Sequence, residues 1–225
     1  MGILNPTSYV KDVPVSIKTQ SGTWNVHNAS NSYHGTITAN EAIAYSLNTV
    51  AVTTLEKVTL TKSYEYLQNF GITSLDKTND MYYPALALGG LTYGISPYEM
   101  TQAYNAISND GKFSNISTIN YIEIDGKKIQ KQKNEHQVIS NDAANKLKTS
   151  LHEVARYGTG KTANLSNTTT YLKTGTTSDV KDVWTCGFTN DLTSCIWGGY
   201  DTPATLPIYN VNSVWKQIMQ YYYNK

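Results

Sequence analysis

Residues 171–200 decide the fold, and they read YLKTGTTSDVKDVWTCGFTNDLTSCIWGGY. Three runs in this stretch are rich in β-branched and aromatic residues, which predicts strands over 171–176, 183–189 and 194–200. Because short turns join antiparallel neighbours, the three strands are expected to form a sheet meander. A helix over 213–222 is expected to follow and to close the chain.

The sequence before residue 169 is expected to be mostly helical. Helices are predicted over five ranges: 38–45, 49–58, 62–70, 97–107 and 141–156. Two of them begin with a capping box, in which a hydroxyl and a carboxylate satisfy backbone donors at the helix start: Thr38 with Glu41, and Ser96 with Glu99.

The remaining stretches are expected to hold little regular structure. The chain up to Gly35 shows no sustained period and is expected to be extended or looped. A strand over 119–124, followed by Asp125-Gly126, predicts one small hairpin. Together these features indicate an α+β fold with helices packed on an antiparallel sheet. We expect a single domain over 1–225, mostly helical with a small hairpin to residue 168, with the meander and closing helix over 169–225.

The composition limits the possible classes of function. With 225 residues, of which 40% are hydrophobic and 16% charged, the chain has the make-up of one globular unit. Its net charge of +1 is spread without basic clusters, which argues against nucleic acid as a partner. No run approaches the roughly 18 apolar residues that span a bilayer. Cys186 and Cys195 have no histidine nearby, which makes them poor metal ligands, and no cofactor is expected.

The strand motif Lys173-Thr174-Gly175-Thr176 can be read for its chemistry. It places a cation beside two hydroxyl groups, and the glycine lets the backbone of a substrate approach closely. Such a surface can bind a carboxylate and transfer protons. Alone, the motif also fits the edge of a strand with a glycine bulge.

A second motif, Ser46-Leu47-Asn48, stands at the end of a predicted helix. Ser46 and Asn48 are two residues apart, so both side chains can face the same cleft. There the carboxamide of Asn48 can hold an amide of the substrate, and the hydroxyl of Ser46 can relay a proton. The plain structural alternative is a helix C-cap.

The order and surroundings of these motifs resemble the C-terminal part of the transpeptidase domain of class A penicillin-binding proteins, the bifunctional cell-wall synthases. Matching blocks cover nearly the whole chain: DVPV (12–15), GTIT (35–38), AIAYSLN (42–48), ALGGLTYGISP (87–97), GTG (158–160), LKTGTT (172–177) and WGGYD (197–201). The resemblance implies the penicillin-binding/β-lactamase-like fold. It also implies that 1–225 is a partial transpeptidase domain, from which the N-terminal part with the nucleophile helix is missing.

The resemblance further implies a serine D,D-transpeptidase that cross-links peptidoglycan stem peptides through an acyl-enzyme. Its partners would be the D-Ala-D-Ala end of a stem peptide, β-lactams that imitate this end, and the missing N-terminal part of the domain. It would act at the extracytoplasmic face of the bacterial membrane as part of a membrane-anchored parent protein. A non-catalytic, truncated interaction module of the same fold is the alternative.

The same resemblance implies roles for the residues of both motifs. Ser46 would relay protons toward the departing D-Ala amine, Asn48 would hold the donor's amide, and Lys173 would supply positive potential and tune Ser46. The threonine hydroxyls of 174–176 would bind the terminal carboxylate, and the glycine between them would leave room for the peptide.

The family's nucleophile motif, Ser-x-x-Lys, has four weak matches: Ser8, Ser74, Ser178 and Ser213, each with a lysine three residues later. A nucleophile needs its serine at the buried start of a helix and its lysine one turn later on the same face. Ser8, Ser74 and Ser178 do not fit this context. Ser213 begins a predicted helix, but the resemblance makes it the closing helix that packs behind the sheet. The resemblance therefore implies that the nucleophilic serine lies upstream of Met1, and the 225-residue chain alone is expected to be inactive.

Residues 155–162, ARYGTGKT, nearly fit the P-loop pattern of nucleotide hydrolases. The pattern fails at its first glycine, which is Ala155, and it should follow a strand and open a helix. The remote alternative of a P-loop nucleotide hydrolase rests on this stretch. The resemblance instead places Gly158-Thr159-Gly160 in the connection before the active-site strand.

The two cysteines flank an expected hairpin tip at Asn190-Asp191. If the loop has two residues, Cys186 and Cys195 lie directly opposite each other at a non-hydrogen-bonded pair, where a cross-strand disulfide is geometrically possible. A shift of one residue in register would put them on opposite faces. Reduced, they would be ordinary small apolar residues.

Overall fold

The computed structural model describes residues 3–19, 22–130, 133–207 and 211–224. Its centre is an antiparallel sheet of three strands in the order β11-β10-β9. The strands are β9 (Tyr171–Thr176), β10 (Asp182–Phe188) and β11 (Thr193–Gly199). The predicted meander and the predicted α+β class are both confirmed.

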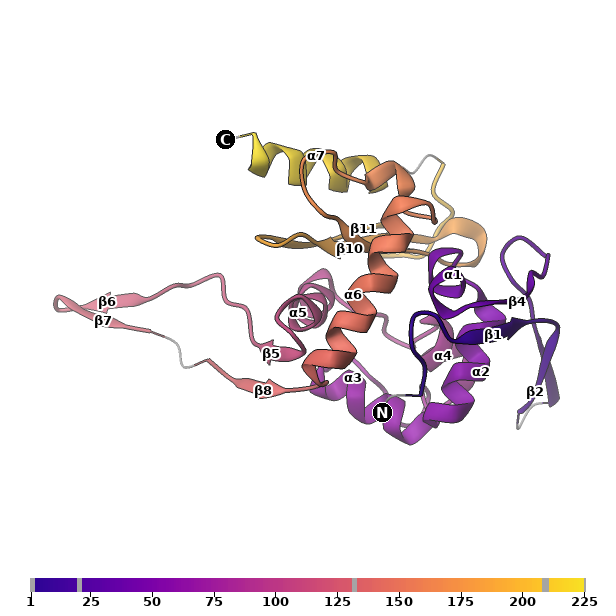
Figure 1. Ribbon diagram of the computed structural model, residues 1–225. Coiled ribbons are helices and arrows are strands. Elements are labelled where there is room, and N and C mark those ends of the chain that lie inside the picture. The colour runs from indigo at the N-terminus through magenta and orange to yellow at the C-terminus, as the bar shows by residue number, and fades with distance from the viewer. Residues whose placement is uncertain (1–2, 20–21, 131–132, 208–210, 225) are drawn as a thin grey trace.

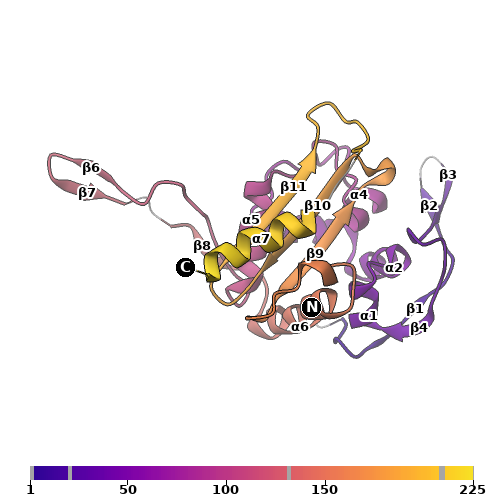
Figure 2. The same ribbon diagram turned by 90° about the horizontal axis from the view of Figure 1, so that it is seen from above.

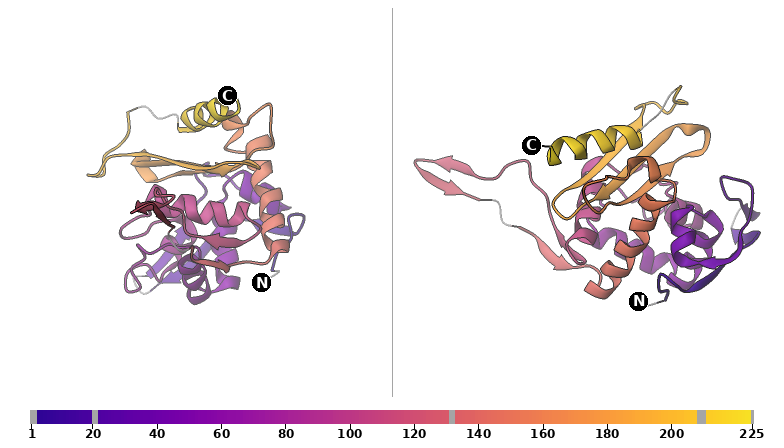
Figure 3. Two further views of the ribbon diagram at one scale, coloured as in Figure 1. Left: turned by 90° about the vertical axis from the view of Figure 1, so that its left-hand side faces the viewer. Right: turned by 45° about the horizontal axis from the view of Figure 1, so that its top comes forward.

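Helices cover both faces of this sheet. In Figures 1 and 3, α7 (Val211–Tyr223) lies on one face and α5 (Pro97–Ser108) on the other. On the α7 side, Trp215 and Met219 are fully buried with Leu172 of β9 and Val154 of α6 (Asn141–Arg156). This cluster holds β9, the strand with the lysine motif, against α6 and α7.

The other helices are α1 (Ala39–Ala44), α2 (Asn48–Val58), α3 (Leu60–Asn69) and α4 (Tyr83–Leu88). All predicted helices are confirmed to within a few residues, and both capping boxes form. Helix α4 was not predicted, because six residues are too few to show a helical period. Within the described ranges, no helix is long and apolar enough to cross a membrane.

The N-terminal stretch is more regular than expected. It forms β1 (Tyr9–Asp12), β2 (Val15–Thr19), β3 (Gly22–Val26) and β4 (Gly35–Thr38). Strand β1 pairs with β4, and β2 pairs with β3. The expectation of one small hairpin in a mostly helical 1–168 was therefore incomplete. Strands of four or five residues show too little alternation, and the β1–β4 pairing joins residues far apart in sequence.

These N-terminal strands pack on α1 and α2. Val10 and Ile37 contact the buried cluster of Ala42, Leu47 and Val50. The β2–β3 hairpin covers Val52 of α2 in a similar way. The two strand pairs therefore support α1 and α2 on either side of the turn that joins these helices.

A long two-stranded arm leaves the body between α5 and α6 (Figure 2). It begins with β5 (Lys112–Ser114) paired to β8 (Glu135–Gln137) and ends in β6 (Ile122–Ile124) paired to β7 (Lys127–Ile129). The turn at Asp125-Gly126 has φ of 50° and 74°, as the primed turn predicted there requires. The predicted small hairpin is confirmed.

Candidate active site

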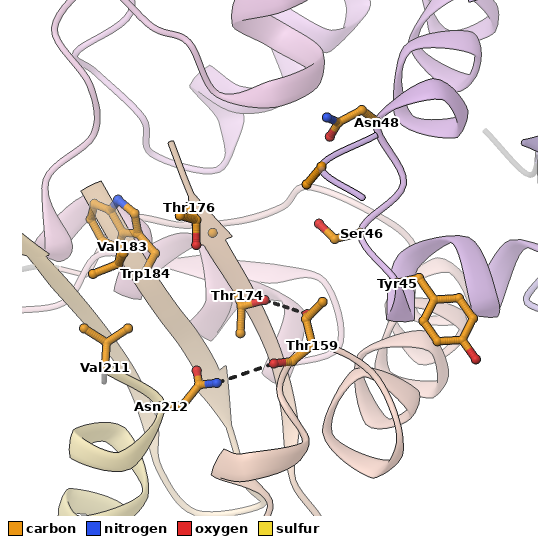
Figure 4. Close-up of a pocket in the computed structure, with 12 residues that line it drawn as sticks. Tyr45, Ser46, Asn48, Thr159, Thr174, Thr176, Val183, Trp184, Val211 and Asn212 are labelled. Atoms are coloured by element: carbon orange, nitrogen blue, oxygen red, sulfur yellow. Dashed lines mark hydrogen bonds between the residues drawn. The ribbon is translucent and has the colours of Figure 1, made fainter. Parts of the chain in front are cut away.

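A cavity of about 360 Å³ lies between the α1–α2 junction and the edge strand β9 (Figure 4). Ser46 and Asn48 line it from the junction, and residues 174–176 line it from β9. The sixth predicted site residue, Lys173, reaches Ser46 through its side chain. The structure thus brings together all six residues that the two motifs predicted.

Lys173 connects the two motifs directly. Its Nζ donates hydrogen bonds of 2.7 Å to Ser46 Oγ and 2.7 Å to the backbone oxygen of Thr174. Burial lowers the pKa of Lys173 to about 8, because the charged form loses hydration. At neutral pH the lysine is mostly protonated and donates to Ser46, but it releases a proton more readily than a solvated lysine.

Ser46 occupies a strained position between α1 and α2. Its φ is 57°, in the left-handed region that costs a residue with a side chain roughly 1–2 kcal/mol. Its N–H donates to Ile43 O at 3.1 Å, and Leu47 N–H donates to Ala42 O at 3.0 Å, so the backbone turns sharply. The surrounding contacts impose this conformation, which aims the hydroxyl at β9. Strained residues of this kind cluster at functional sites.

A buried carboxylate, Asp12, holds the junction from behind. Its Oδ1 accepts hydrogen bonds from Thr49 Oγ1 at 2.5 Å and Asn28 Nδ2 at 2.7 Å. Its Oδ2 accepts from the backbone N–H of His34 at 2.7 Å and lies 3.0 Å from His34 Nδ1. Burial alone would raise the pKa of Asp12, but the hydrogen bonds from Thr49, Asn28 and His34 outweigh it and lower the pKa.

This network reaches the site through the first turn of α2. Thr49 follows Asn48, and its backbone N–H donates to Asn28 Oδ1 at 3.3 Å. Asn48 Nδ2 donates to His27 O at 2.8 Å. Asp12 at the end of β1 and the segment between β3 and β4, which carries His27 and Asn28, therefore set where the Asn48 side chain lies.

Thr159 and Asn212 are among the lining residues that were not predicted as part of the site. Thr174 Oγ1 donates to Thr159 Oγ1 at 2.6 Å, and Asn212 Nδ2 lies 3.4 Å from Thr159 O (Figure 4). Asn212 Oδ1 in turn accepts from Thr185 Oγ1 at 2.6 Å. The resemblance placed Thr159 close to the strand without a role. Nothing in the local sequence singles out Asn212, which enters the cavity wall from the first turn of α7.

Residues 158–160 pack tightly between the two halves of the site. A Cβ at Gly158 would overlap the backbone oxygen of Ala44, and one at Gly160 would overlap the Leu172 side chain. Thr159 N–H donates to Ala44 O at 3.0 Å. The glycines are therefore needed for contact with α1 and β9.

The P-loop alternative is wrong. Ala155 lies in the last turn of α6, and Lys161 begins a 3-10 helix of three residues. A P-loop needs a strand before its glycines and a full helix after them, because the helix N-terminus binds the phosphates.

None of the serines of the four Ser-x-x-Lys matches is among the residues that line the cavity. Ser8 is in the turn before β1, and Ser74 Oγ donates to Gly94 O at 2.8 Å. Ser178 is exposed in a short 3-10 helix, and Ser213 is in the first turn of α7. Ser46 is the serine among the lining residues.

The residues that the structure describes contain no group of three or more His, Cys, Asp or Glu side chains placed to hold a metal ion. The site offers a cation, hydroxyl groups and a carboxamide instead. Such a set can bind a carboxylate, hold a peptide amide and relay a proton.

Comparisons with known proteins identify the family of this chain. The family model for the penicillin-binding protein transpeptidase domain matches residues 1–200. Penicillin-binding protein 4 of Bacillus subtilis is 33% identical over 199 residues, which are 86% of this chain and 32% of that protein. Penicillin-binding protein 1A of Clostridium botulinum is 32% identical over 88% of this chain and 24% of that protein. The chain thus spans about a quarter to a third of the length of these relatives.

Solved structures share the fold. Penicillin-binding protein 1A of Haemophilus influenzae superposes with a TM-score of 0.76 at 22% identity, over 88% of this chain and 35% of that chain. Penicillin-binding protein 3 of Mycobacterium tuberculosis, solved with aztreonam, gives 0.77 at 21% identity, over 99% of this chain and 58% of that chain. With the family model covering residues 1–200, this chain belongs to the penicillin-binding protein transpeptidase domain family.

Proposed function

We propose that this chain is the C-terminal part of a D,D-transpeptidase domain that cross-links peptidoglycan stem peptides through a serine acyl-enzyme. The observation that carries the proposal is the 2.7 Å hydrogen bond from Lys173 Nζ to Ser46 Oγ, which joins residues 127 positions apart at one cavity. Fold similarity alone would not support an activity, because one fold hosts many functions.

The proposed donor is a peptide that ends in D-Ala-D-Ala. Thr174 and Thr176 hydroxyls, beside the Lys173 cation, suit its terminal carboxylate. Among the described strands, β9 pairs only with β10, so its outer edge offers backbone groups to an extended peptide. Asn48 would hold the peptide amide from the opposite wall. A backbone N–H at Thr176 would stabilise the oxyanion, a contribution of roughly 3 kcal/mol per donor.

In the reaction, the serine oxygen attacks the carbonyl carbon of the D-Ala-D-Ala peptide bond, and the terminal D-Ala leaves with a proton on its nitrogen. Ser46, hydrogen-bonded to Lys173, is placed to deliver that proton. An amine of a second stem peptide then attacks the ester and restores the serine. We propose that this serine comes from polypeptide outside the described residues, because none of the four Ser-x-x-Lys serines lines the cavity.

A β-lactam would enter as an imitation of the donor, with its ring carboxylate on Thr174 and Thr176. The mycobacterial structural neighbours were solved with aztreonam and with ampicillin, which supports this choice of probe. We further propose an extracytoplasmic location on a membrane-anchored parent, since peptidoglycan lies outside the membrane.

A fluorescent penicillin tests the proposal on two proteins: the 225-residue chain, and the same chain joined to an upstream segment that carries a Ser-x-x-Lys motif. We expect covalent labelling of the joined protein only. Labelling of the 225-residue chain would identify an internal nucleophile, with Ser46 the first to map by mass spectrometry. Labelling of neither protein would overturn the transpeptidase proposal in favour of a non-catalytic interaction module.

A further inference from the structure

Two cysteines face each other in the sheet that carries the site. Cys186 of β10 lies directly opposite Cys195 of β11. The hairpin between them closes with a hydrogen bond of 2.9 Å from Thr189 N–H to Leu192 O, which leaves Asn190-Asp191 at the tip as predicted from the sequence. Both thiols are free.

The strand register places the two cysteines at a non-hydrogen-bonded pair, the kind of cross-strand pair that a disulfide can span. Because 189 and 192 exchange a backbone hydrogen bond, they form a hydrogen-bonded pair. Antiparallel pairs alternate along a ladder, so 186 and 195, three steps away, form a non-hydrogen-bonded pair. At such pairs the Cα atoms lie about 4.5 Å apart, within the range that disulfides span.

The side chains are also in contact. Cys195 lies close enough to the Cys186 thiol to add to the effect of burial in raising its pKa. Tyr104 of α5 lies close enough to interact with both cysteines. Cys186 is buried, at 3% exposure, whereas Cys195 is partly exposed. An oxidant therefore reaches Cys195 first, and Cys186 is held within reach to complete the reaction.

We propose that Cys186 and Cys195 form a cross-strand disulfide when the protein meets a disulfide oxidant, either a small oxidised thiol or a thiol oxidoreductase. The Cys195 thiolate attacks the external disulfide and gives a mixed disulfide and one external thiol. Cys186 then loses its proton, attacks the Cys195 sulfur and releases the second external thiol. The two cysteines lose two electrons and two protons in total, and the external disulfide is reduced.

The bond would lie directly beside the candidate active site. Cys186 is also the cross-strand partner of Lys173 in β9, and neighbours at directly opposite positions share one face of the sheet. The disulfide would therefore link β10, the strand that pairs with Lys173, covalently to β11 and fix the register between β10 and β11. Its physiological occurrence rests on the proposed extracytoplasmic function, since thiols are kept reduced in the cytosol.

The test uses the full 225-residue chain, equilibrated with glutathione disulfide and then alkylated after denaturation. We expect a native product lighter by two hydrogen atoms, with no alkylated thiol before reduction and two afterwards. The matched control is the double substitution Cys195→Ser with Ser194→Cys, which keeps two thiols but moves one to position 194, opposite Gly187. In an antiparallel ladder this position points to the other face.

The oxidation rates of the two cysteine pairs show whether the folded strand register, rather than closeness in sequence, favours the disulfide. If the proposal holds, the natural pair oxidises at least tenfold faster than the shifted pair under native conditions, and the two pairs oxidise alike in denaturant. Equal rates under native conditions, or two free thiols in the native wild-type chain, would overturn it. Penicillin labelling has no part in this readout, so failure of the disulfide is distinguishable from failure of the proposed transpeptidase.

Discussion

Side-chain hydrogen bonds hold the α1–α2 junction, whereas a backbone ladder holds strand β9, although both carry residues of the same site. At the junction, the bonds from Thr49, Asn28 and His34 converge on the single carboxylate of Asp12. Strand β9 pairs with β10 along its whole length and buries Leu172 in the core. One substitution can therefore release the junction, but the position of β9 is shared among many contacts.

The largest effect is expected from the strand residue that joins the two regions. Lys173→Met should lower the rate of acylation by penicillin by about 100-fold or more, because proton transfer through Ser46 loses its partner. The change should not unfold the protein, since the ladder of β9 does not depend on this side chain. The rate is measured by stopped-flow acylation of the active domain, by which we mean the chain joined to the upstream Ser-x-x-Lys segment. Lys62→Met, at an exposed position on α3, is the control. Loss of folding in Lys173→Met would contradict this view of β9.

Asp12→Ala should have the next largest effect, on stability. It leaves the buried donors of Thr49 and Asn28 unsatisfied, at a cost of about 2–4 kcal/mol in the free energy of unfolding. Urea unfolding measures the loss. Glu123→Ala, at an exposed position in the β6–β7 hairpin, should change stability by less than about 0.5 kcal/mol. If the two substitutions changed the free energy of unfolding equally, the hydrogen bonds of Asp12 would not be what stabilises the α1–α2 junction.

The two regions should also respond to pH at opposite ends of the scale. The pKa of Asp12 is lowered from 3.8, so its stabilisation is present above pH 3.8 and lost as pH falls through its folded pKa. The pKa of Lys173 is lowered from 10.5 to about 8, so the unfolded state binds more protons between these values and stability rises from pH 8 to 10.5. A plot of the free energy of unfolding against pH should therefore have two sloping arms: an acid arm from Asp12 and an alkaline arm from Lys173. Asp12→Asn should make the acid arm shallower without removing it, because Glu99, whose pKa is lowered from 4.5 to about 2, contributes to the same arm. Lys173→Met should flatten the alkaline arm, and an alkaline arm that survives this substitution would belong to another group.

A smaller effect is expected from the backbone strain at the junction. Ser46 has a φ of 57°, which glycine adopts freely and alanine does not. Ser46→Gly should therefore be more stable than Ser46→Ala by about 1 kcal/mol, and both should acylate slowly. Thermal unfolding of the two variants provides the comparison. Equal stability would mean that the conformation of Ser46 is not strained.

The smallest effect is expected from Thr174→Val. It removes the hydroxyl that donates to Thr159 Oγ1 and that we propose binds the substrate carboxylate. Because β9 stays in place, the loss should be roughly 1 kcal/mol, or about fivefold in the second-order acylation rate. Thr174→Ser keeps the hydroxyl and should restore most of the rate. If serine fails to do so, the methyl group rather than the hydroxyl matters.

The contrast between the two regions also explains how far the sequence could be interpreted. The meander, the helices with capping boxes and the position of the lysine motif on a strand depend on local patterns, and all three were confirmed. The support of the junction could not be predicted, because Asp12, Asn28 and Thr49 meet only after β1 and β4 pair. Short strands give little periodic signal, and a buried polar network leaves no pattern along the chain.

The histidines show the same limit. Scattered along the chain, they show no pattern in the sequence that points to a tertiary contact. His152 is nevertheless partly buried and contacts Thr170 O at 3.1 Å. His34, although exposed, contacts Asp12 and stacks on Tyr45. These contacts join separate segments and depend on the tertiary structure alone.

A double-mutant cycle on Ser46 and Lys173 tests most directly whether the two regions act as one site. The acylation rate by a fluorescent penicillin would be measured for the active domain, for Ser46→Ala, for Lys173→Met and for the double variant. Residues that act as a unit are strongly non-additive. Because one hydrogen bond of 2.7 Å joins them, we predict that the double variant is no slower than Lys173→Met alone. Losses that multiply, so that each substitution acts independently of the other, would contradict the account.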